Sequence, residues 1–188
     1  MIRFLTESFN ISSEEAEILS TCFQVRKFKK GDAFLRLGEI SNRVGFIEEG
    51  MLKCAMVSNG KEVIDDFVFE HQFVANYHSF LTQTPSGKAL VCMKDSTIRV
   101  AYRHQLEELG ERHLFMERIA RLIAEGLFIN THQKLEDIRL LSAEERYLKM
   151  LKSSKEMIRE LPQYEIASYL NVSPETVSRI RNSIKSRS

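Results

Sequence analysis

The sequence lacks any long apolar run. Its beginning, residues 1–19, mixes apolar side chains with acidic ones, and no later segment approaches the roughly 20 consecutive apolar residues that a bilayer-spanning helix needs. This pattern predicts neither a signal peptide nor a transmembrane segment. We therefore expect a cytoplasmic protein without a membrane partner.

The sequence also lacks clustered metal ligands and catalytic groups. Cys22, Cys54 and Cys92 are too far apart for a CxxC motif, and their odd number is typical of reduced, buried thiols. His71 and His78 do not form a His-x-His pair. Because no nucleophile–base pair, metal set or phosphate loop is present, we predict no metal, no catalytic residue and no enzyme activity.

The net charge of +1 over 188 residues hides an uneven distribution. Residues 142–188 contain nine Lys/Arg and six Asp/Glu, a balance of +3, whereas residues 1–141 contain 18 and 20, a balance of −2. A nucleic-acid partner would therefore contact the C-terminal part, where cations attract phosphates. An ordinary solvated surface is the alternative.

Residues 161–183, LPQYEIASYLNVSPETVSRIRNS, have the pattern of a helix-turn-helix. Ile166 and Leu170 lie on one helical face, and Asn171 then tolerates the left-handed backbone of a turn. Ser173 is a good N-cap and Pro174 suits the first position of a second helix. Two helices joined by a tight turn are predicted.

The second helix separates an apolar stripe from a polar face. Val177, Ile180 and Ile184 repeat with the helical period. Arg can bind guanine and Glu can accept a hydrogen bond from cytosine in the major groove, while flanking cations suit phosphates. The alternative is a two-helix corner with a solvated face. The predicted DNA-binding residues are Ser173, Glu175, Thr176, Ser178, Arg179, Arg181, Asn182 and Lys185.

From Phe23 onward, glycines divide the chain into short alternating runs. The runs have the length of strands of four to six residues, and Asn59-Gly60 is typical of a type I′ hairpin turn. This pattern of short runs separated by glycines predicts a small antiparallel barrel or roll.

Residues 28–74 resemble the β-roll of the cyclic-nucleotide-binding fold. With a C-terminal helix-turn-helix, the chain is similar to the Crp/Fnr family of bacterial transcription regulators over nearly its whole length. The resemblance implies an α+β protein: an antiparallel β-roll (jelly roll), a long dimerisation helix and a small winged helix-turn-helix domain. The motifs that carry it are Gly31-Asp32, Leu37-Gly38-Glu39, Phe46-Ile47, Glu49-Gly50 and Asn59-Gly60-Lys61-Glu62.

The resemblance places an effector pocket at residues 73–91. Members that bind cyclic AMP have a Glu for the ribose and an Arg for the phosphate, whereas this chain has Asn76 and Lys88 nearby. We therefore expect no cofactor: cyclic AMP is not favoured, and another small effector stays open. The candidate pocket residues are Asn76, Tyr77, His78, Lys88, Ala89, Asn130 and Thr131.

From Arg103 onward the apolar residues recur with the helical period. Gly110 is expected to mark a break before a longer helix that begins near residues 112–113. The apolar band of that helix is wide enough to face two partners, which favours a homodimer. Ser142 and Glu145 form a capping-box pattern that starts the next helix. The predicted domains are a β-roll sensor (1–111), a dimerisation helix and hinge (112–141) and a helix-turn-helix domain (142–188), with 153–161 as a reduced wing.

Together these patterns predict a homodimeric, sequence-specific transcription regulator. Its recognition helices would enter successive major grooves of double-stranded DNA about 34 Å apart, so the operator would be an inverted repeat. RNA polymerase is a further candidate partner. The alternative is an effector-sensing or interaction module that no longer binds specific DNA.

Overall fold

The structure is a computed structural model that describes residues 1–153, 158 and 160–186. The chain divides into two compact units, Met1–Ala124 and Glu125–Ser188. The division falls within the long helix α5 (Phe115–Leu140), so this one helix belongs to both units.

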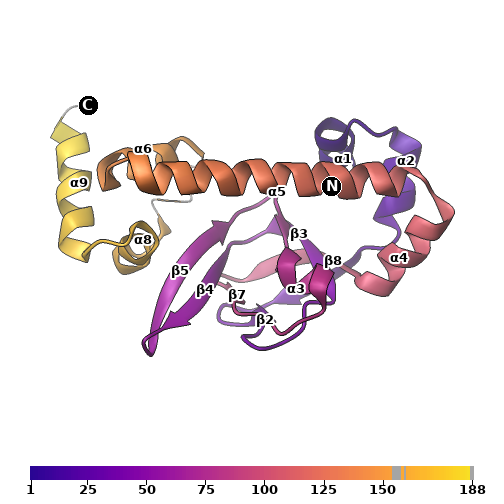
Figure 1. The fold of residues 1–188 in the computed structure, drawn as a ribbon, viewed down its shortest axis with the longest axis horizontal. Helices are drawn as coiled ribbons and strands as arrows, with labels where there is room; N and C mark the ends of the chain where they lie inside the picture. Colours follow the sequence, from indigo (N-terminus) through magenta and orange to yellow (C-terminus); the bar gives the residue numbers. More distant parts are fainter. Residues whose placement is uncertain (154–157, 159, 187–188) are drawn as a thin grey trace. The chain divides into compact units, whose positions relative to one another are not determined.

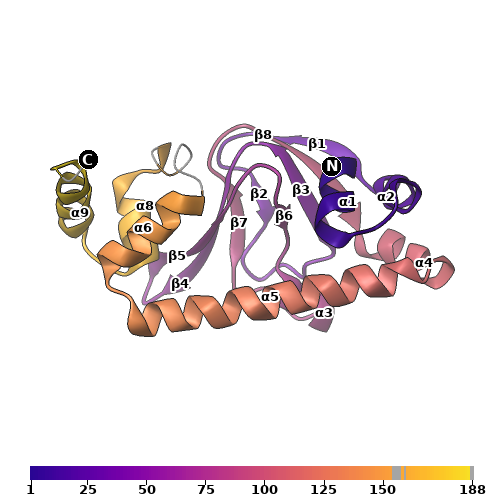
Figure 2. The same ribbon diagram turned by 90° about the horizontal axis from the view of Figure 1, so that it is seen from above.

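The first unit contains two four-stranded antiparallel sheets that form the predicted β-roll (Figures 1 and 2). The strand order is β1-β8-β3-β6 in one sheet and β2-β7-β4-β5 in the other. The strands are β1 (Gln24–Phe28), β2 (Ala33–Leu35), β3 (Arg43–Glu49), β4 (Leu52–Ser58), β5 (Lys61–Val68), β6 (Phe73–Val74), β7 (Ala89–Cys92) and β8 (Ser96–Tyr102).

Two of the predicted turns owe their shape to residues with positive φ. Asn59 (φ 51°) and Gly60 (φ 73°) join β4 to β5, which confirms the type I′ hairpin. Gly50 (φ 120°) lies between β3 and β4, and a Cβ there would meet the Ser96 side chain 2.1 Å away. Glycine is therefore needed at position 50 for both backbone conformation and space.

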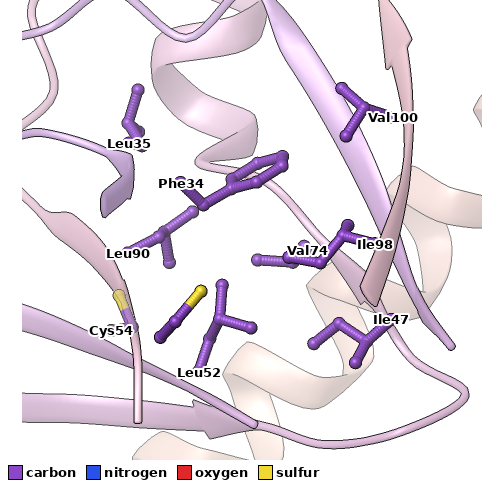
Figure 3. Close-up of a cluster of buried hydrophobic side chains, with 10 residues drawn as sticks. Phe34, Leu35, Ile47, Leu52, Cys54, Val74, Leu90, Ile98 and Val100 are labelled. Carbon is purple, nitrogen blue, oxygen red and sulfur yellow. The ribbon is translucent and has the colours of Figure 1, made fainter. Parts of the chain in front are cut away.

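The core of the roll lies between the two sheets. Both sheets contribute apolar side chains to one cluster (Figure 3), and in β4, β7 and β8 the residues of this cluster alternate along the strand. Burial of this surface is the main force that holds the sheets together. The ten buried residues are Phe34, Leu35, Ile47, Leu52, Cys54, Val74, Leu90, Cys92, Ile98 and Val100.

Helices pack a second cluster at one end of the roll. Helix α2 (Ser13–Ser20) is capped reciprocally by Ser12 and Glu15. The preceding helix α1 (Ile2–Phe9) was not predicted, because Met1 gives no side-chain cap and the helix is only two turns long. Its Leu5 packs in a buried cluster that also contains Ile119 of α5.

Helix α5 begins two to three residues later than predicted. Helix α4 (Arg103–Arg112) continues through Gly110, and His113 then adopts an extended backbone (φ −137°). Gly110 has no positive φ, and a single glycine costs a helix only about 1 kcal/mol relative to Ala. The expectation that Gly110 ends the helix was therefore wrong.

The second unit carries the predicted helix-turn-helix. Ser142 and Glu145 form the capping box at the start of α6 (Ala143–Ser153). Asn171 adopts the left-handed conformation (φ 54°, ψ 49°) between α8 (Gln163–Leu170) and α9 (Pro174–Ser186), which confirms the turn. The predicted wing at 153–161 lies largely outside the described residues.

Among the described residues, no helix combines the length and the apolar character needed to cross a membrane.

Candidate nucleic-acid interface and effector region

Helix α9 is seated on α8 through a small buried core. Val177 and Ile180 of α9 are buried, as are Ile166 and Leu170 of α8. The side-chain amide of Gln163 also donates a hydrogen bond to the carbonyl of Pro174 (2.5 Å). The apolar stripe predicted for α9 therefore faces inward, and its polar side faces solvent.

The N-terminal turn of α9 is held by short-range polar contacts. Ser173 Oγ accepts a hydrogen bond from the Thr176 amide (3.3 Å), as expected of an N-cap. Hydrogen bonding with Ser173 is the largest cause that lowers the pKa of Glu175, followed by a backbone hydrogen bond and the charge of Arg179. Arg179 in turn donates to Thr176 Oγ1 (3.2 Å). This turn therefore presents an ionised carboxylate and a guanidinium to solvent.

The predicted DNA-binding residues differ in exposure. Ser173, Glu175, Arg179 and Asn182 are exposed, whereas other members of the set are half-buried. The half-buried members are Thr176, Ser178 and Arg181. The side chain of Lys185 lies outside the described residues, although its backbone belongs to α9.

Arg181 is directed toward the interior of the unit. Its Nε donates to the hydroxyl of Tyr147 in α6 (3.1 Å), and Tyr147 is 4% exposed. Arg146 of the same helix donates to the carbonyl of Leu170 (2.9 Å). These contacts hold α8 and α9 to α6. The helical period places Arg181 beside the apolar stripe, one turn after Val177, but it does not identify Tyr147 as the partner of Arg181.

The C-terminal half of α5 carries an exposed apolar stripe. Leu127, Phe128, Leu135 and Ile138 are between 41% and 71% exposed. At 3.6 residues per turn these four side chains lie within about 100° of one another around the helix. Ile129 is equally exposed, at 54%, but points to a different side. A stripe of this kind is unusual on a helix that meets only water.

The last turns of α5 are tied to the helix-turn-helix. Lys149 of α6 forms an ion pair with Asp137, with N···O distances of 2.6 and 2.9 Å. Lys134 lies over the ring of Tyr169 in α8, 5.4 Å from its centroid. The predicted hinge residues are thus helical as far as Leu140.

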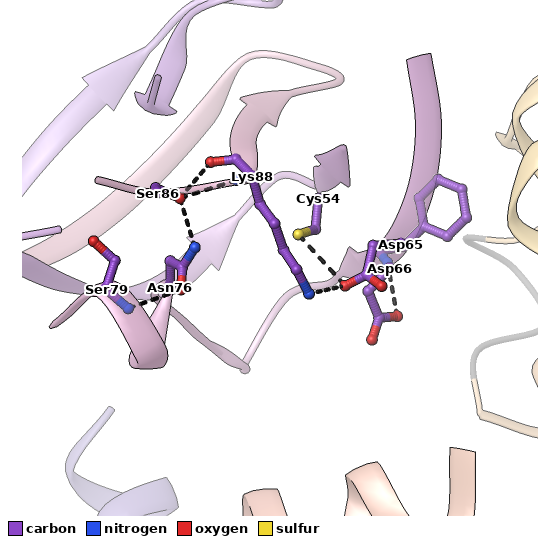
Figure 4. A network of polar contacts seen from close by, with 8 residues as sticks. Cys54, Asp65, Asp66, Asn76, Ser79, Ser86 and Lys88 are labelled. Carbon is purple, nitrogen blue, oxygen red and sulfur yellow. Dashed lines mark hydrogen bonds and ion pairs between the residues drawn. The ribbon is translucent and has the colours of Figure 1, made fainter. Parts of the chain in front are cut away.

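In the predicted effector region, Asn76 acts mainly as a cap. Its Oδ1 accepts from the amide of Ser79 (3.2 Å) at the start of α3 (Tyr77–Thr82), and its Nδ2 donates to Ser86 Oγ (2.5 Å). Ser86 Oγ also contacts the backbone of Lys88 (Figure 4). The structure therefore connects Asn76 to Lys88 through a buried serine.

The ammonium group of Lys88 is paired within the protein. Its Nζ lies 2.6 Å from Oδ2 of Asp65 on β5, and the thiol of Cys54 lies 3.8 Å from the same oxygen (Figure 4). Sequence reasoning missed Asp65, because it lies 23 residues before Lys88 and on another strand. Asp65 could have been predicted only from the strand register, which requires the topology of the roll to be known.

The remaining candidate pocket residues have ordinary surroundings. Tyr77 and Ala89 are half-buried and His78 is exposed. Asn130 and Thr131 are exposed on α5 and belong to the second unit. Only Asn76 and Lys88 are therefore brought into one network.

The three cysteines are free and buried, as predicted. Burial raises the pKa of the Cys92 thiol to about 11, and burial also raises the pKa of Cys22. The thiols of Cys22 and Cys92 are therefore protonated at neutral pH. Among the described residues, no three His, Cys, Asp or Glu side chains gather as metal ligands.

Comparisons with known proteins agree with this architecture. Residues 25–113 match the model of the cyclic nucleotide-binding domain. FixK2 of Bradyrhizobium japonicum superposes with a TM-score of 0.74 at 18% identity, covering 88% of this chain and 85% of FixK2. The regulator CLP of Xanthomonas campestris, described as responsive to c-di-GMP, gives 0.71 at 14%, covering 94% and 93%. A putative Crp/Fnr-family regulator of Eubacterium rectale gives 0.65 at 14%, covering 95% and 85%. No curated protein sequence matches the chain.

The class that fold and site define is a cyclic nucleotide-binding domain followed by a long helix and a helix-turn-helix. Residues 25–113 match the family model of the cyclic nucleotide-binding domain. The chain as a whole has the fold of the Crp/Fnr transcription regulators, which confirms the resemblance stated from the sequence.

Proposed function

We propose that the protein is a homodimeric, sequence-specific DNA-binding transcription regulator. The observation that carries this proposal is the exposed polar face of α9, where Glu175, Arg179 and Asn182 project from a helix anchored by buried Val177 and Ile180. A helix of this width enters the major groove, where Arg and Glu side chains discriminate guanine and cytosine.

The exposed stripe of α5 supports a second copy of the chain as the partner. Two-fold symmetry would place the same stripe on both subunits, so the four apolar side chains would bury one another. Two recognition helices would then meet half-sites about 34 Å apart. We therefore assign residues 112–141 to dimerisation and 142–188 to DNA binding, with an effector-sensing role for the roll in 1–111. Contact with RNA polymerase stays a prediction.

DNA binding can be tested without a known operator. Selection from randomised duplexes, followed by mobility shifts at two salt concentrations, should recover an inverted repeat that binds far more tightly than unrelated DNA. Binding that is salt-sensitive but has no sequence preference would contradict the proposal. It would instead favour a sensory module without specific DNA recognition.

Dimerisation can be tested on the helix stripe. Phe128→Asp places a charge in the proposed interface and should convert the dimer to a monomer in light scattering. Ile129→Asp is the matched control, because it alters an equally apolar, exposed residue on a different side of the same helix. Equal dissociation by both variants, or a monomeric native protein, would rule out this interface.

A further inference from the structure

In the roll, the carboxylate of Asp65 forms an ion pair with Lys88, the cation that an anionic ligand in residues 73–91 would need. Asp65 Oδ2 lies 2.6 Å from Lys88 Nζ, with the two side chains only 26% and 39% exposed. Lys88 is the cation that residues 73–91 offer to an anionic ligand. Its charge is already balanced by a group from another strand.

The position of Asp65 follows from an irregularity in the sheet. Cys54 pairs with Asp66, but the next residue, Ala55, pairs with Ile64, so Asp65 is the extra residue of a β-bulge. A bulge changes the direction of a side chain, and here it lets the Asp65 carboxylate reach Lys88 at the start of β7. Asp66, one position later, accepts a hydrogen bond from the Phe67 amide instead (2.9 Å; Figure 4).

The other polar groups of the network are also engaged. Asn76 caps α3 and donates to Ser86, while Ser86 Oγ donates to the Lys88 carbonyl (2.6 Å) and accepts from the Lys88 amide (3.1 Å). A phosphate entering here would meet Asp65 next to Lys88, the one Lys or Arg within residues 73–91. Like charges held this close together repel each other, and a partly buried site screens that repulsion less than bulk water does.

We propose that Asp65 is a specificity-determining residue that neutralises Lys88 and excludes phosphate-bearing ligands, cyclic nucleotides among them, from the roll. The inference rests on the proposed function in that it treats the roll as the sensory part of the protein. It concerns ligand binding alone, so it can be measured on the full chain without DNA.

The experiment is equilibrium dialysis of the full-length protein against labelled cyclic AMP and labelled cyclic GMP. Asp65→Asn keeps the shape and removes the charge. It should bind cyclic AMP at least about tenfold more tightly than the native protein, about 1.4 kcal/mol, and the gain should weaken with salt. Asp66→Asn, with the same change in net charge, should behave as the native protein does. The double variant Asp65→Asn, Lys88→Met should lose the gain.

Three results would overturn the proposal: native binding as tight as that of Asp65→Asn, no gain in Asp65→Asn, or a gain that survives loss of Lys88. Circular dichroism checks that each variant folds, and Asp65→Ser replaces Asp65→Asn if that variant does not. Failure of specific DNA binding in the separate selection experiment would overturn the proposed function and leave this result standing.

Discussion

The two units of the molecule use their polar side chains in opposite ways. In the roll, Asp65, Asn76, Ser86 and Lys88 bond to one another, so few of their hydrogen-bonding sites face outward. On α9, Glu175 and Arg179 interact with neighbours at the start of the same helix and remain exposed. Neighbouring strands bring together residues that are far apart in the sequence, so opposite charges such as Asp65 and Lys88 can pair. A single exposed helix face instead presents its charged side chains to solvent. The charged side chains of α9 are therefore more accessible to a binding partner than those of the network in the roll.

The two units also differ in how they are stabilised. The roll has a two-sheet core and a turn at Gly50 that leaves no room for a Cβ, while α6 in the second unit is held by an exposed cap and an exposed ion pair. Substitutions in the roll should therefore be costlier than those in the caps.

The largest effect is expected at the tight turn of the roll. Gly50→Ala would force a Cβ to within 2.8 Å of the Ser96 backbone at φ 120°, so we expect a loss of about 3 kcal/mol in the free energy of unfolding. Gly60→Ala is the control: its φ is also positive (73°), but its Cβ meets nothing within 4 Å, and the loss should be about 1 kcal/mol. Chemical denaturation measures both. Equal losses would show that the roll is not closely packed at Gly50.

The next effect concerns recognition by α9. Arg179→Ala should reduce discrimination between the selected operator and a variant site by about 1–3 kcal/mol, because a bidentate contact with a base would be lost. Stability should stay within about 0.5 kcal/mol of native, since Arg179 is exposed. Mobility shifts on matched and mismatched duplexes check the first expectation and thermal melting the second. If Arg179→Ala discriminates between the two duplexes as well as the native protein does, Arg179 does not contact the bases.

A smaller effect is expected two residues further along the same helix. Arg181→Ala should lower the free energy of unfolding by about 1 kcal/mol, because its hydrogen bond to the buried Tyr147 hydroxyl is lost. Tyr147→Phe removes the same bond from the other side and should have a similar cost. If melting is unchanged and only the salt dependence of DNA binding falls, Arg181 serves the phosphates and not the fold.

The smallest effect concerns the cap of α6. Hydrogen bonds from the backbone and then the side chain of Ser142 lower the pKa of Glu145 from 4.5. A lowered folded-state pKa means that this stabilisation is present above pH 4.5 and is lost as the pH falls through the lowered value. NMR titration of the Glu145 carboxyl should show the shift, and Ser142→Ala should reduce it. An unshifted titration in the native protein would contradict the capping box.

Much of the second unit was predictable because its signals are local. Ser142 with Glu145, and Asn171 followed by Ser173 and Pro174, specify caps and a turn within four residues of one another. The hairpin at Asn59-Gly60 was predicted for the same reason. By contrast, α1 was missed because it has no side-chain cap and spans only two turns, while its Leu5 is buried in a cluster that reaches as far along the chain as Ile119.

The sequence by itself determined where α6 and α9 begin, where the chain turns at Asn59-Gly60 and Asn171, and which face of α9 is polar, because capping, positive φ and helical period act over a few residues. Only the tertiary structure decided which polar groups are available. It directed Arg181 to Tyr147 while leaving Arg179 exposed, and it brought Asp65 to Lys88 through a bulge in β5. These choices depend on sheet register and helix packing, which are set by contacts between segments far apart in the chain.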